Sequence, residues 1–430
     1  MKEYQFPSSN TITLQNNHHY KTILFYVVFY LTYLIYKTLP QQDYIRDLSH
    51  HYHTNIYETL FWHGSCYQYP YESNLPPRRC PMLTPLITEI QRFCLQDGPG
   101  IRTTIFVKGC PLQCPWCHNP ENISLKPEFY FHANKCKGCG QCVGSCPSGV
   151  CTSFVPQKGV EEIVDRSRCT SCLGCVSACR FGARETVGKP LDMNAIVEEA
   201  VSDRIFYNNS GGGVTISGGE PLMYPAFTRE LTRILKVRED VHVAVETCLF
   251  AEWENIVPLL EFVDLFIVDI KSLEPEKYEQ VIGGSLHKIL ANLERLIKAG
   301  AATRIHLPII PGINDTAGDF EMYAEYLGQF ADYLTGVDLL PYHSYATGKY
   351  AQLGRRYHYL GVPDLAARNL FPLADALRIK GIREVTIGGL VGTISPTGTA
   401  VGNEASRADG SILPRRPHPS RAKGVVPVRQ

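Results

Sequence analysis

The spacing of its cysteines constrains this chain more than any other feature of the sequence. Sixteen cysteines occur in 430 residues, and eleven of them fall into three tight groups between Cys110 and Cys179. Cysteines two or three residues apart are poorly placed to form disulfides with each other but well placed to direct thiolates at one metal centre. Disulfide frameworks are typical of small secreted domains, whereas this chain is large and 44% apolar. We therefore expect metal clusters in a reducing, cytoplasmic environment.

The first group lies in the segment "KGCPLQCPWCHNPE" and directly follows a predicted strand. Its C-x3-C-x2-C spacing places Cys110, Cys114 and Cys117 on one loop. Three thiolates can hold three irons of a [4Fe–4S] cluster and leave the fourth iron open to a substrate, as a catalytic metal centre requires. The alternative is zinc with His118 as fourth ligand, but a histidine adjacent to Cys117 closes a tetrahedron only with strain.

The other two groups repeat the C-x2-C-x2-C-x3-C spacing of bacterial ferredoxins. In two-cluster ferredoxins the fourth cysteine of each run serves the other cluster. This rule predicts one cluster on Cys136, Cys139, Cys142 and Cys179, and another on Cys169, Cys172, Cys175 and Cys146. A structural zinc module is the alternative, and the clusters could relay electrons or only stiffen a docking surface. The five remaining cysteines, Cys66, Cys80, Cys94, Cys151 and Cys248, are interpreted as small buried residues.

From Thr103 onward, short β-branched or apolar runs alternate with amphipathic segments. Strands are predicted over 103–107, 213–217, 241–247, 265–270, 303–310 and 337–342, and helices over 193–208, 224–238, 286–299 and 319–335. This order predicts an α/β fold with a parallel sheet and right-handed crossovers, open or curled into part of a barrel. Chemistry in such folds collects at the carboxyl ends of the strands. Residues 135–185 interrupt the alternation and are predicted to be an inserted module.

The two ends of the chain differ from this pattern. Residues 1–81 are expected to be an N-terminal extension, either a mis-called start with Met82 as the native first residue, or a segment whose apolar run is a tilted anchor, a signal peptide or a buried segment. The apolar run Ile23–Tyr36 is shorter than the roughly 20 residues of a membrane-spanning helix. Residues 391–430 are basic and rich in proline, and a disordered tail is expected. The formal net charge is zero, so composition gives no sign of a nucleic-acid partner.

The C-x3-C-x2-C loop with Trp116 before its last cysteine resembles the radical S-adenosylmethionine superfamily. The segment "QRFCLQDGPGIRTTIFVKGC" (91–110) more narrowly resembles the glycyl-radical enzyme activating enzymes of the pyruvate formate-lyase activator type. The resemblance covers about Thr88 to Leu390. It implies a partial (β/α)6 barrel over 82–390, interrupted by a ferredoxin-like insert at 135–185.

The resemblance also implies an activity, its cofactors and its partners. Such an enzyme reductively cleaves S-adenosylmethionine at a [4Fe–4S] cluster and installs a glycyl radical on a partner enzyme by hydrogen abstraction. The implied cofactors are three [4Fe–4S] clusters, S-adenosylmethionine and a monovalent cation. Electrons would come from a flavodoxin or a ferredoxin-type protein.

Polar residues at predicted strand ends complete the candidate site. Taken alone, the run "GGGVTISGGEP" is a tight strand–helix turn, and polar residues at strand ends are caps or salt bridges. By resemblance, S-adenosylmethionine is bound by Trp116, Cys117, His118, Gly218, Gly219, Glu220, Glu246, Asp269, Ile270, Lys271 and His343. Glu246, Thr247 and Asp269 match a cation site whose first ligand is aspartate in the family's prototype. Residues 97–102 match a loop near the docked partner, whereas Arg304 and His306 receive no role.

Two other functions were weighed. One is a different radical maturase, or a small-molecule radical enzyme, with two auxiliary clusters. The other is an electron-transfer protein. In an electron carrier, however, every iron of the cluster normally has a protein ligand, whereas the C-x3-C-x2-C loop leaves one iron without a thiolate. The insert follows the first predicted strand, and no cysteines occur beyond Cys248. This position favours an activating enzyme.

Overall fold

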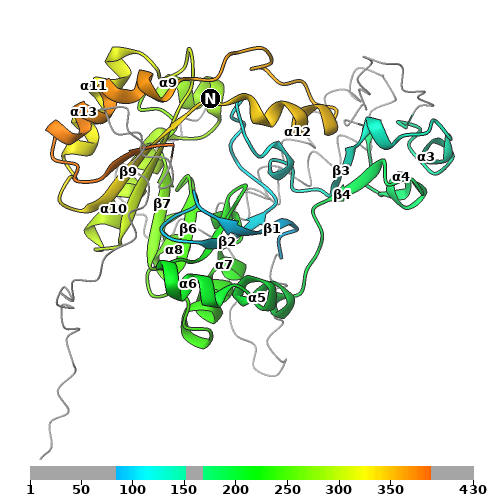
Figure 1. Cartoon of the computed structure of the whole chain (residues 1–430), viewed down its shortest axis with the longest axis horizontal. Helices are drawn as coiled ribbons and strands as arrows, with labels where there is room; N and C mark the ends of the chain where they lie inside the picture. The colour runs from blue at the N-terminus through cyan, green and yellow to red at the C-terminus, as the bar shows by residue number, and fades with distance from the viewer. Residues whose placement is uncertain (1–83, 152–167, 389–430) are drawn as a thin grey trace, which may run out of the picture. The chain divides into compact units, whose positions relative to one another are not determined.

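The computed structural model describes residues 84–151 and 168–388, which form an α/β fold around one eight-stranded sheet (Figure 1). Its strands, in sheet order, are β1 (Ile87–Cys94), β2 (Arg102–Val107), β5 (Gly213–Gly218), β6 (Val243–Thr247), β7 (Leu265–Asp269), β8 (Thr303–Ile309), β9 (Leu334–Pro341) and β10 (Val385–Ile387). All neighbours pair in parallel except β1 and β2. The predicted parallel sheet is therefore confirmed.

The six predicted strands correspond to β2 and β5 to β9, and the sequence analysis missed the strands at both edges. β1 runs antiparallel to β2 and exposes much of its length, so its sequence lacks the apolar run of a central strand. β10 has only three residues. The inner strands β5 and β6 are almost wholly buried, as parallel strands covered on both faces must be.

The helices follow the predicted segments with several corrections. They include α5 (Met193–Val201), α6 (Arg204–Ser210), α7 (Pro225–Arg233), α8 (Trp253–Ile256), α9 (Pro275–Lys277), α10 (Leu286–Lys298), α11 (Ala317–Gly328), α12 (Thr347–Gln352) and α13 (Phe371–Ile379). The segment predicted as one helix over 193–208 breaks at Asp203, whose buried carboxylate pairs with Arg92 of β1. The helix predicted over 319–335 begins earlier, because Thr316 and Asp319 form a capping box. It also ends earlier, and β9 starts at Leu334.

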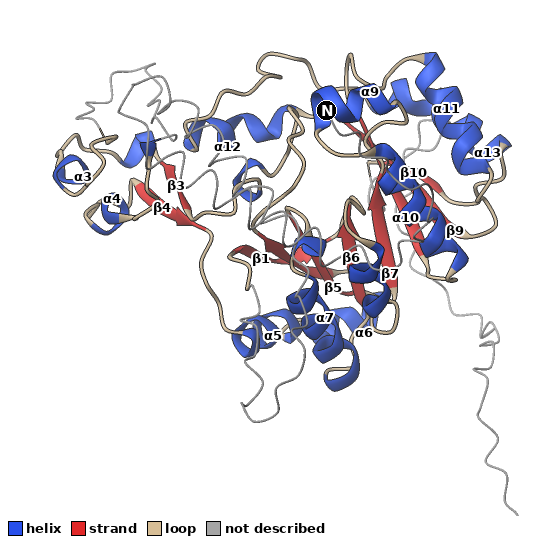
Figure 2. Cartoon of the chain, turned by 180° about the vertical axis from the view of Figure 1, so that it is seen from behind, coloured by secondary structure: helices blue, strands red, loops and turns tan. Residues whose placement is uncertain are grey.

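The described part of the cysteine-rich segment forms a small cluster of elements that gather together in Figures 1 and 2. β3 (Glu128–Phe131) and β4 (Arg184–Val187) pair antiparallel, and α3 (Gln141–Gly144) lies against α4 (Gly174–Ser177). The two cysteine runs share one backbone conformation. Gly138 and Gly140 have positive φ in the first run, and Ser171 and Leu173 have positive φ at the matching positions of the second. The repeat seen in the sequence is thus also a structural repeat.

Several predictions concern residues outside the described ranges. The extension 1–81, the start at Met82, the apolar run Ile23–Tyr36 and the tail 391–430 lie there, as does 152–167 within the cysteine-rich segment. Among the described helices, none is long and apolar enough to span a bilayer.

Candidate active site

The three cysteines of the first group and the carboxyl ends of the parallel strands enclose one cavity. Its wall includes Cys110, Cys114, Trp116, Cys117, His118, Gly218, Gly219, Glu246, Thr247, Asp269 and Lys271. These residues come from the loop after β2 and from the ends of β5, β6 and β7. Most of the predicted site residues are therefore neighbours in space, as the shared edge of a parallel sheet requires.

The cysteine loop is braced by the segment that contains α12. Lys349 Nζ donates to Asn119 Oδ1 at 2.9 Å and to Glu121 Oε1 at 2.6 Å. Arg355 pairs with Glu128 at 2.7 Å, and the buried Lys108 pairs with the same carboxylate at 2.8 Å. Buried, paired charges fix the loop because breaking one pair leaves a charge without compensation.

Gly218 and Gly219 let the end of β5 lie directly against the cysteine loop. A Cβ on Gly219 would meet the carbonyl oxygen of Gly109 at 2.0 Å, and one on Gly218 would meet backbone atoms of Val107 at 2.3 Å. Gly218 also has φ +119°, a conformation that side chains disfavour. The Gly-Gly pair therefore has a packing role in addition to any contact with a ligand.

Glu220 and Ile270 lie behind the cavity wall. The Glu220 carboxylate accepts from Thr247 Oγ1 at 2.7 Å, from Cys248 N at 2.8 Å and from Leu222 N at 2.9 Å. Glu220 thereby ties the turn after β5 to the end of β6. The Ile270 side chain is buried in the core. Neither residue lines the cavity, although both were predicted to bind S-adenosylmethionine.

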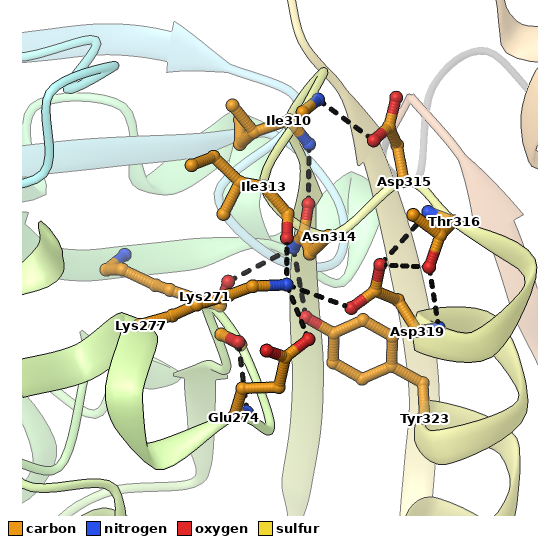
Figure 3. A network of polar contacts seen from close by, with 12 residues as sticks. Lys271, Glu274, Lys277, Ile310, Ile313, Asn314, Asp315, Thr316, Asp319 and Tyr323 are labelled. Carbon is orange, nitrogen blue, oxygen red and sulfur yellow. Dashed lines mark hydrogen bonds and ion pairs between the residues drawn. The ribbon is translucent and has the colours of Figure 1, made fainter.

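Lys271 faces the cavity, and its loop is held from behind. Its ammonium lies 3.3 Å from Asp269 Oδ2. Burial opposes the charge, but Asp269 and Cys114 raise the pKa of Lys271 well above its usual range. The Asn314 amide donates to the Lys271 carbonyl at 3.1 Å and to the Tyr323 hydroxyl at 2.9 Å (Figure 3). Asn314, on the loop after β8, is a positioning residue that the sequence analysis missed.

His343 lies on a second, more open groove that adjoins the cavity. The groove is lined by Phe93, Leu95, Asp97, His306, His343 and Tyr345, among others, and shares His118, Asn119, Glu246, Pro308 and Leu340 with the cavity. Asp97 accepts from Thr104 at 2.5 Å, and the buried Arg102 donates to Thr215 at 2.6 Å. These contacts hold the 97–102 loop beside the groove. Because the groove shares residues with the cavity, it offers an approach from solvent to the cysteine loop.

Arg304 and His306, which had no predicted role, belong to a buried charged network. His306 Nδ1 lies 3.2 Å from Glu246 Oε1, and its Nε2 lies 3.3 Å from Asp338 Oδ2. Arg304 Nε donates to Asp338 at 2.5 Å. Burial opposes protonation, but the two carboxylates outweigh it and raise the pKa of His306 to about 10.

Two of the three residues predicted to hold a cation, Glu246 and Asp269, lie together with His306. Ligand atoms of Glu246, Asp269 and His306 lie within 4.8 Å of one another. Both Glu246 oxygens already accept hydrogen bonds, from Ser217 and from His306. The third predicted ligand, Thr247, donates its hydroxyl to Glu220, and His306 completes this group instead.

Asn122 and Cys248 are among the cavity residues that the sequence analysis did not predict as site residues. Asn122 is buried, its Oδ1 accepts from Thr88, and its Nδ2 has no hydrogen-bond partner among the described residues. Cys248, interpreted above as a small buried residue, also lies on the wall. Burial, followed by the negative charge of Glu220, raises its pKa well above the usual value. Cys248 lies outside the C-x3-C-x2-C loop, directly after the last residue of β6.

The loop cysteines fit a cluster by their chemistry. They are free thiols on one wall of a cavity with Lys271 close by. Without metal, burial raises the pKa of all three, that of Cys114 to about 12. Iron binding must displace these protons, so cluster assembly is coupled to deprotonation.

The eight cysteines of the two ferredoxin-type runs divide between two further cavities. Cys136, Cys139, Cys142 and Cys179 line one, and Cys146, Cys169, Cys172 and Cys175 line the other. Each cavity thus takes three cysteines from one run and the fourth from the other run, which is the division predicted from ferredoxins.

Comparisons with known proteins agree with this geometry. The family models for the radical SAM superfamily, the 4Fe-4S dicluster domain and the 4Fe-4S single cluster domain match residues 170–327, 128–180 and 96–148. The benzylsuccinate synthase activating enzyme of Thauera aromatica is 51% identical over 315 residues, which are 72% of this chain and 95% of that protein. The chain belongs to the glycyl-radical enzyme activating enzymes.

More distant relatives are other activating enzymes. The choline trimethylamine-lyase activating enzyme of Oleidesulfovibrio alaskensis is 37% identical over 68% of this chain and 94% of that protein. A solved domain of a pyruvate-formate lyase-activating enzyme from Bacteroides vulgatus is 26% identical, with a TM-score of 0.36, over 42% of this chain and 100% of that domain. As an activating enzyme, this chain reductively cleaves S-adenosylmethionine at a [4Fe–4S] cluster and installs a glycyl radical on a partner enzyme. The predicted activity is therefore confirmed.

Proposed function

We propose that Cys110, Cys114 and Cys117 hold the [4Fe–4S] cluster of the reaction and that S-adenosylmethionine fills the cavity beside them. When bound, the cluster and this cofactor supply the electron transfer and the hydrogen-abstracting radical. The protein itself binds and orients the cluster and the cofactor, and it shields the radical from solvent. The observation that carries the proposal is the convergence of these three thiols with the polar ends of β5, β6 and β7 on one cavity.

The cavity wall carries groups suited to the two ends of an amino-acid cofactor. Lys271 offers an ammonium to a carboxylate, and Asp269 and Glu246 offer carboxylates to an ammonium, as charge-assisted hydrogen bonds. The free Asn122 amide offers a further donor. His118 has a buried ring nitrogen without a partner in the described residues. Burial, followed by the charge of His343, lowers its pKa to about 4, so it is neutral at physiological pH.

We assign the groove next to the cavity to the glycine-bearing segment of the partner enzyme. It is more open than the cavity and meets it at His118 and Glu246. Exposed apolar side chains at its rim, including Phe93 at 49% exposure, suit a protein substrate. The 51% identity over most of the chain points to a benzylsuccinate synthase as the partner.

The segment between β3 and β4 is proposed to be a ferredoxin-like insert with two further [4Fe–4S] clusters. The division of its eight run cysteines between two cavities supports this assignment, and electron relay from a flavodoxin or ferredoxin-type donor is its proposed role. The main sheet is proposed to curve as a partial radical-SAM barrel. Every described cysteine is free of disulfide, which supports a reducing cytoplasmic location.

Anaerobic reconstitution tests these assignments. Cys114→Ala should abolish formation of 5′-deoxyadenosine, whereas Cys172→Ala should keep part of it when dithionite supplies electrons directly. Mixing the intact enzyme with a benzylsuccinate synthase should produce the electron paramagnetic resonance doublet of a glycyl radical. Cleavage that survives Cys114→Ala would refute the cluster assignment, and a radical formed only on another glycyl-radical enzyme would refute the partner.

A further inference from the structure

The two auxiliary cavities differ in their number of cysteines. The first is lined by four, namely Cys136, Cys139, Cys142 and Cys179. The second is lined by five, because Cys151 joins Cys146, Cys169, Cys172 and Cys175. A [4Fe–4S] cluster needs only four thiolates. One thiol at the second cavity is therefore in excess.

Cys151 lies close to two of the four predicted ligands of the second cavity, Cys146 and Cys175. It is only 3% exposed and packs in a small cluster with Phe129, Val150 and Cys175. Cys146 packs against the same cluster, so Cys151 packs with two of the predicted ligands, Cys146 and Cys175. Cys151 therefore lines the same cavity as the ligands that it could replace.

The expected fourth ligand is the one that Cys151 could replace. Cys169, Cys172 and Cys175 belong to one run, whereas Cys146 reaches this cavity from the other run. Cys146 is half-buried, and Cys151 follows it after a short turn that includes Ser148 and Gly149, where Gly149 has positive φ. The same stretch of backbone thus presents two thiols to one cavity.

We propose that Cys151 is a reserve ligand of the second auxiliary cluster and binds its fourth iron when Cys146 is lost or released. The exchange involves no oxidation or reduction. The iron–sulfur bond to Cys146 breaks, the bond to Cys151 forms, and the proton of the Cys151 thiol passes to the departing thiolate. The inference rests on the proposed two-cluster insert and makes that cluster more tolerant of ligand loss than the first.

Matched single substitutions at the two fourth ligands test this inference. Cys179→Ala removes the fourth ligand of the four-thiol cavity, and Cys146→Ala removes that of the five-thiol cavity. Iron and acid-labile sulfide per chain, together with electron paramagnetic resonance of the reduced protein, are measured after anaerobic reconstitution. Cys146→Ala should keep the wild-type iron content of about twelve per chain, expected for three four-iron clusters, whereas Cys179→Ala should lose iron.

The double substitution Cys146→Ala with Cys151→Ala should lose iron like Cys179→Ala, and Cys151→Ala alone should keep it. The response of the 110–117 cluster spectrum to S-adenosylmethionine checks that each variant is folded. If Cys146→Ala does not fold, Cys146→Ser with and without Cys151→Ala replaces it, and only the double variant should lose iron.

Equal iron loss in Cys146→Ala and Cys179→Ala would overturn the inference, as would a double variant that holds as much iron as Cys146→Ala. A wild-type chain that binds only one cluster would instead overturn the two-cluster insert itself. The two failures are therefore distinguishable.

Discussion

The imidazole rings of His118 and His343 are stacked, with 4.1 Å between their centroids and 27° between their planes. One ring belongs to the cysteine loop and the other follows β9, so the contact joins the loop after β2 to the opposite part of the sheet. The His118 ring lies on the cavity, and the His343 ring lies on the groove. The pair therefore stands where cofactor and partner would meet.

Removing this stack should weaken cofactor binding. His343→Gln deletes an aromatic contact, so we expect the Kd for S-adenosylmethionine to rise about tenfold, or about 1.4 kcal/mol. Binding is measured by titrating the reduced cluster with S-adenosylmethionine and following its spectrum. His358→Gln, on an exposed histidine, is the control and should bind as wild type. An unchanged Kd in His343→Gln would argue against a contact with the cofactor.

Cys248 should prove dispensable for the cluster although it lies on the same cavity. Cys248 lies outside the C-x3-C-x2-C loop that supplies the three proposed ligands, so Cys248→Ala should retain wild-type iron content and cleavage of S-adenosylmethionine. Cys117→Ala is the matched variant and should reduce cleavage to background. Iron analysis and detection of 5′-deoxyadenosine make the comparison. Loss of the cluster in Cys248→Ala would instead make that thiol a fourth ligand.

Asn314 should control cofactor affinity without touching the cofactor. Asn314→Ala removes the hydrogen bond to the Lys271 carbonyl. It also removes the hydrogen bond that the Ile310 amide donates to Asn314 Oδ1 at 2.7 Å. Unpartnered buried groups cost about 1–3 kcal/mol each, so we expect a lower Tm and a Kd for S-adenosylmethionine raised about tenfold. Asp315→Asn changes the adjacent residue and should leave both near wild type. A lowered Tm with unchanged affinity would confine Asn314 to stability.

His306 should make stability depend on pH above neutrality. Its pKa is about 10 in the folded chain and about 6.5 when unfolded. The folded state therefore holds a proton that the unfolded state releases, and the stabilisation is complete below pH about 6.5 and lost as pH rises toward 10. Tm of the metal-free protein should fall between pH 6.5 and 8.5, and a variant with the same cysteines separates this slope from the titration of thiols. His306→Gln should flatten this slope, and parallel slopes would refute the charged imidazole.

Much of the candidate site could be predicted because its parts carry local signals. The cysteine spacings identify metal ligands without any knowledge of the fold. The residues at the ends of β5, β6 and β7 meet because the carboxyl ends of parallel strands share one edge. These two rules bring Cys110, Gly219, Glu246 and Lys271 to one cavity.

The remainder depends on contacts that no local pattern encodes. Glu220 is held behind the cavity wall by one donor of its own turn, Leu222 N, and by two donors at the end of β6, Thr247 Oγ1 and Cys248 N. The roles of Asn314 and Cys151 could not be predicted, because they depend on residues distant in sequence that the fold brings next to them. The edge strand β1 is half exposed, so it lacks the apolar run by which the inner strands were found.

The chain of buried charges from Glu246 through His306 and Asp338 to Arg304 has a consequence for how this sequence can diverge. Each of these side chains neutralises its neighbour across β6, β8 and β9. Replacing one alone leaves a buried charge without its opposite, a loss of about 3–5 kcal/mol. Related proteins should therefore either keep all four residues or replace them in pairs that preserve the balance of charge. These buried positions should change more slowly in evolution than the residues of the groove, which must adapt to each new partner.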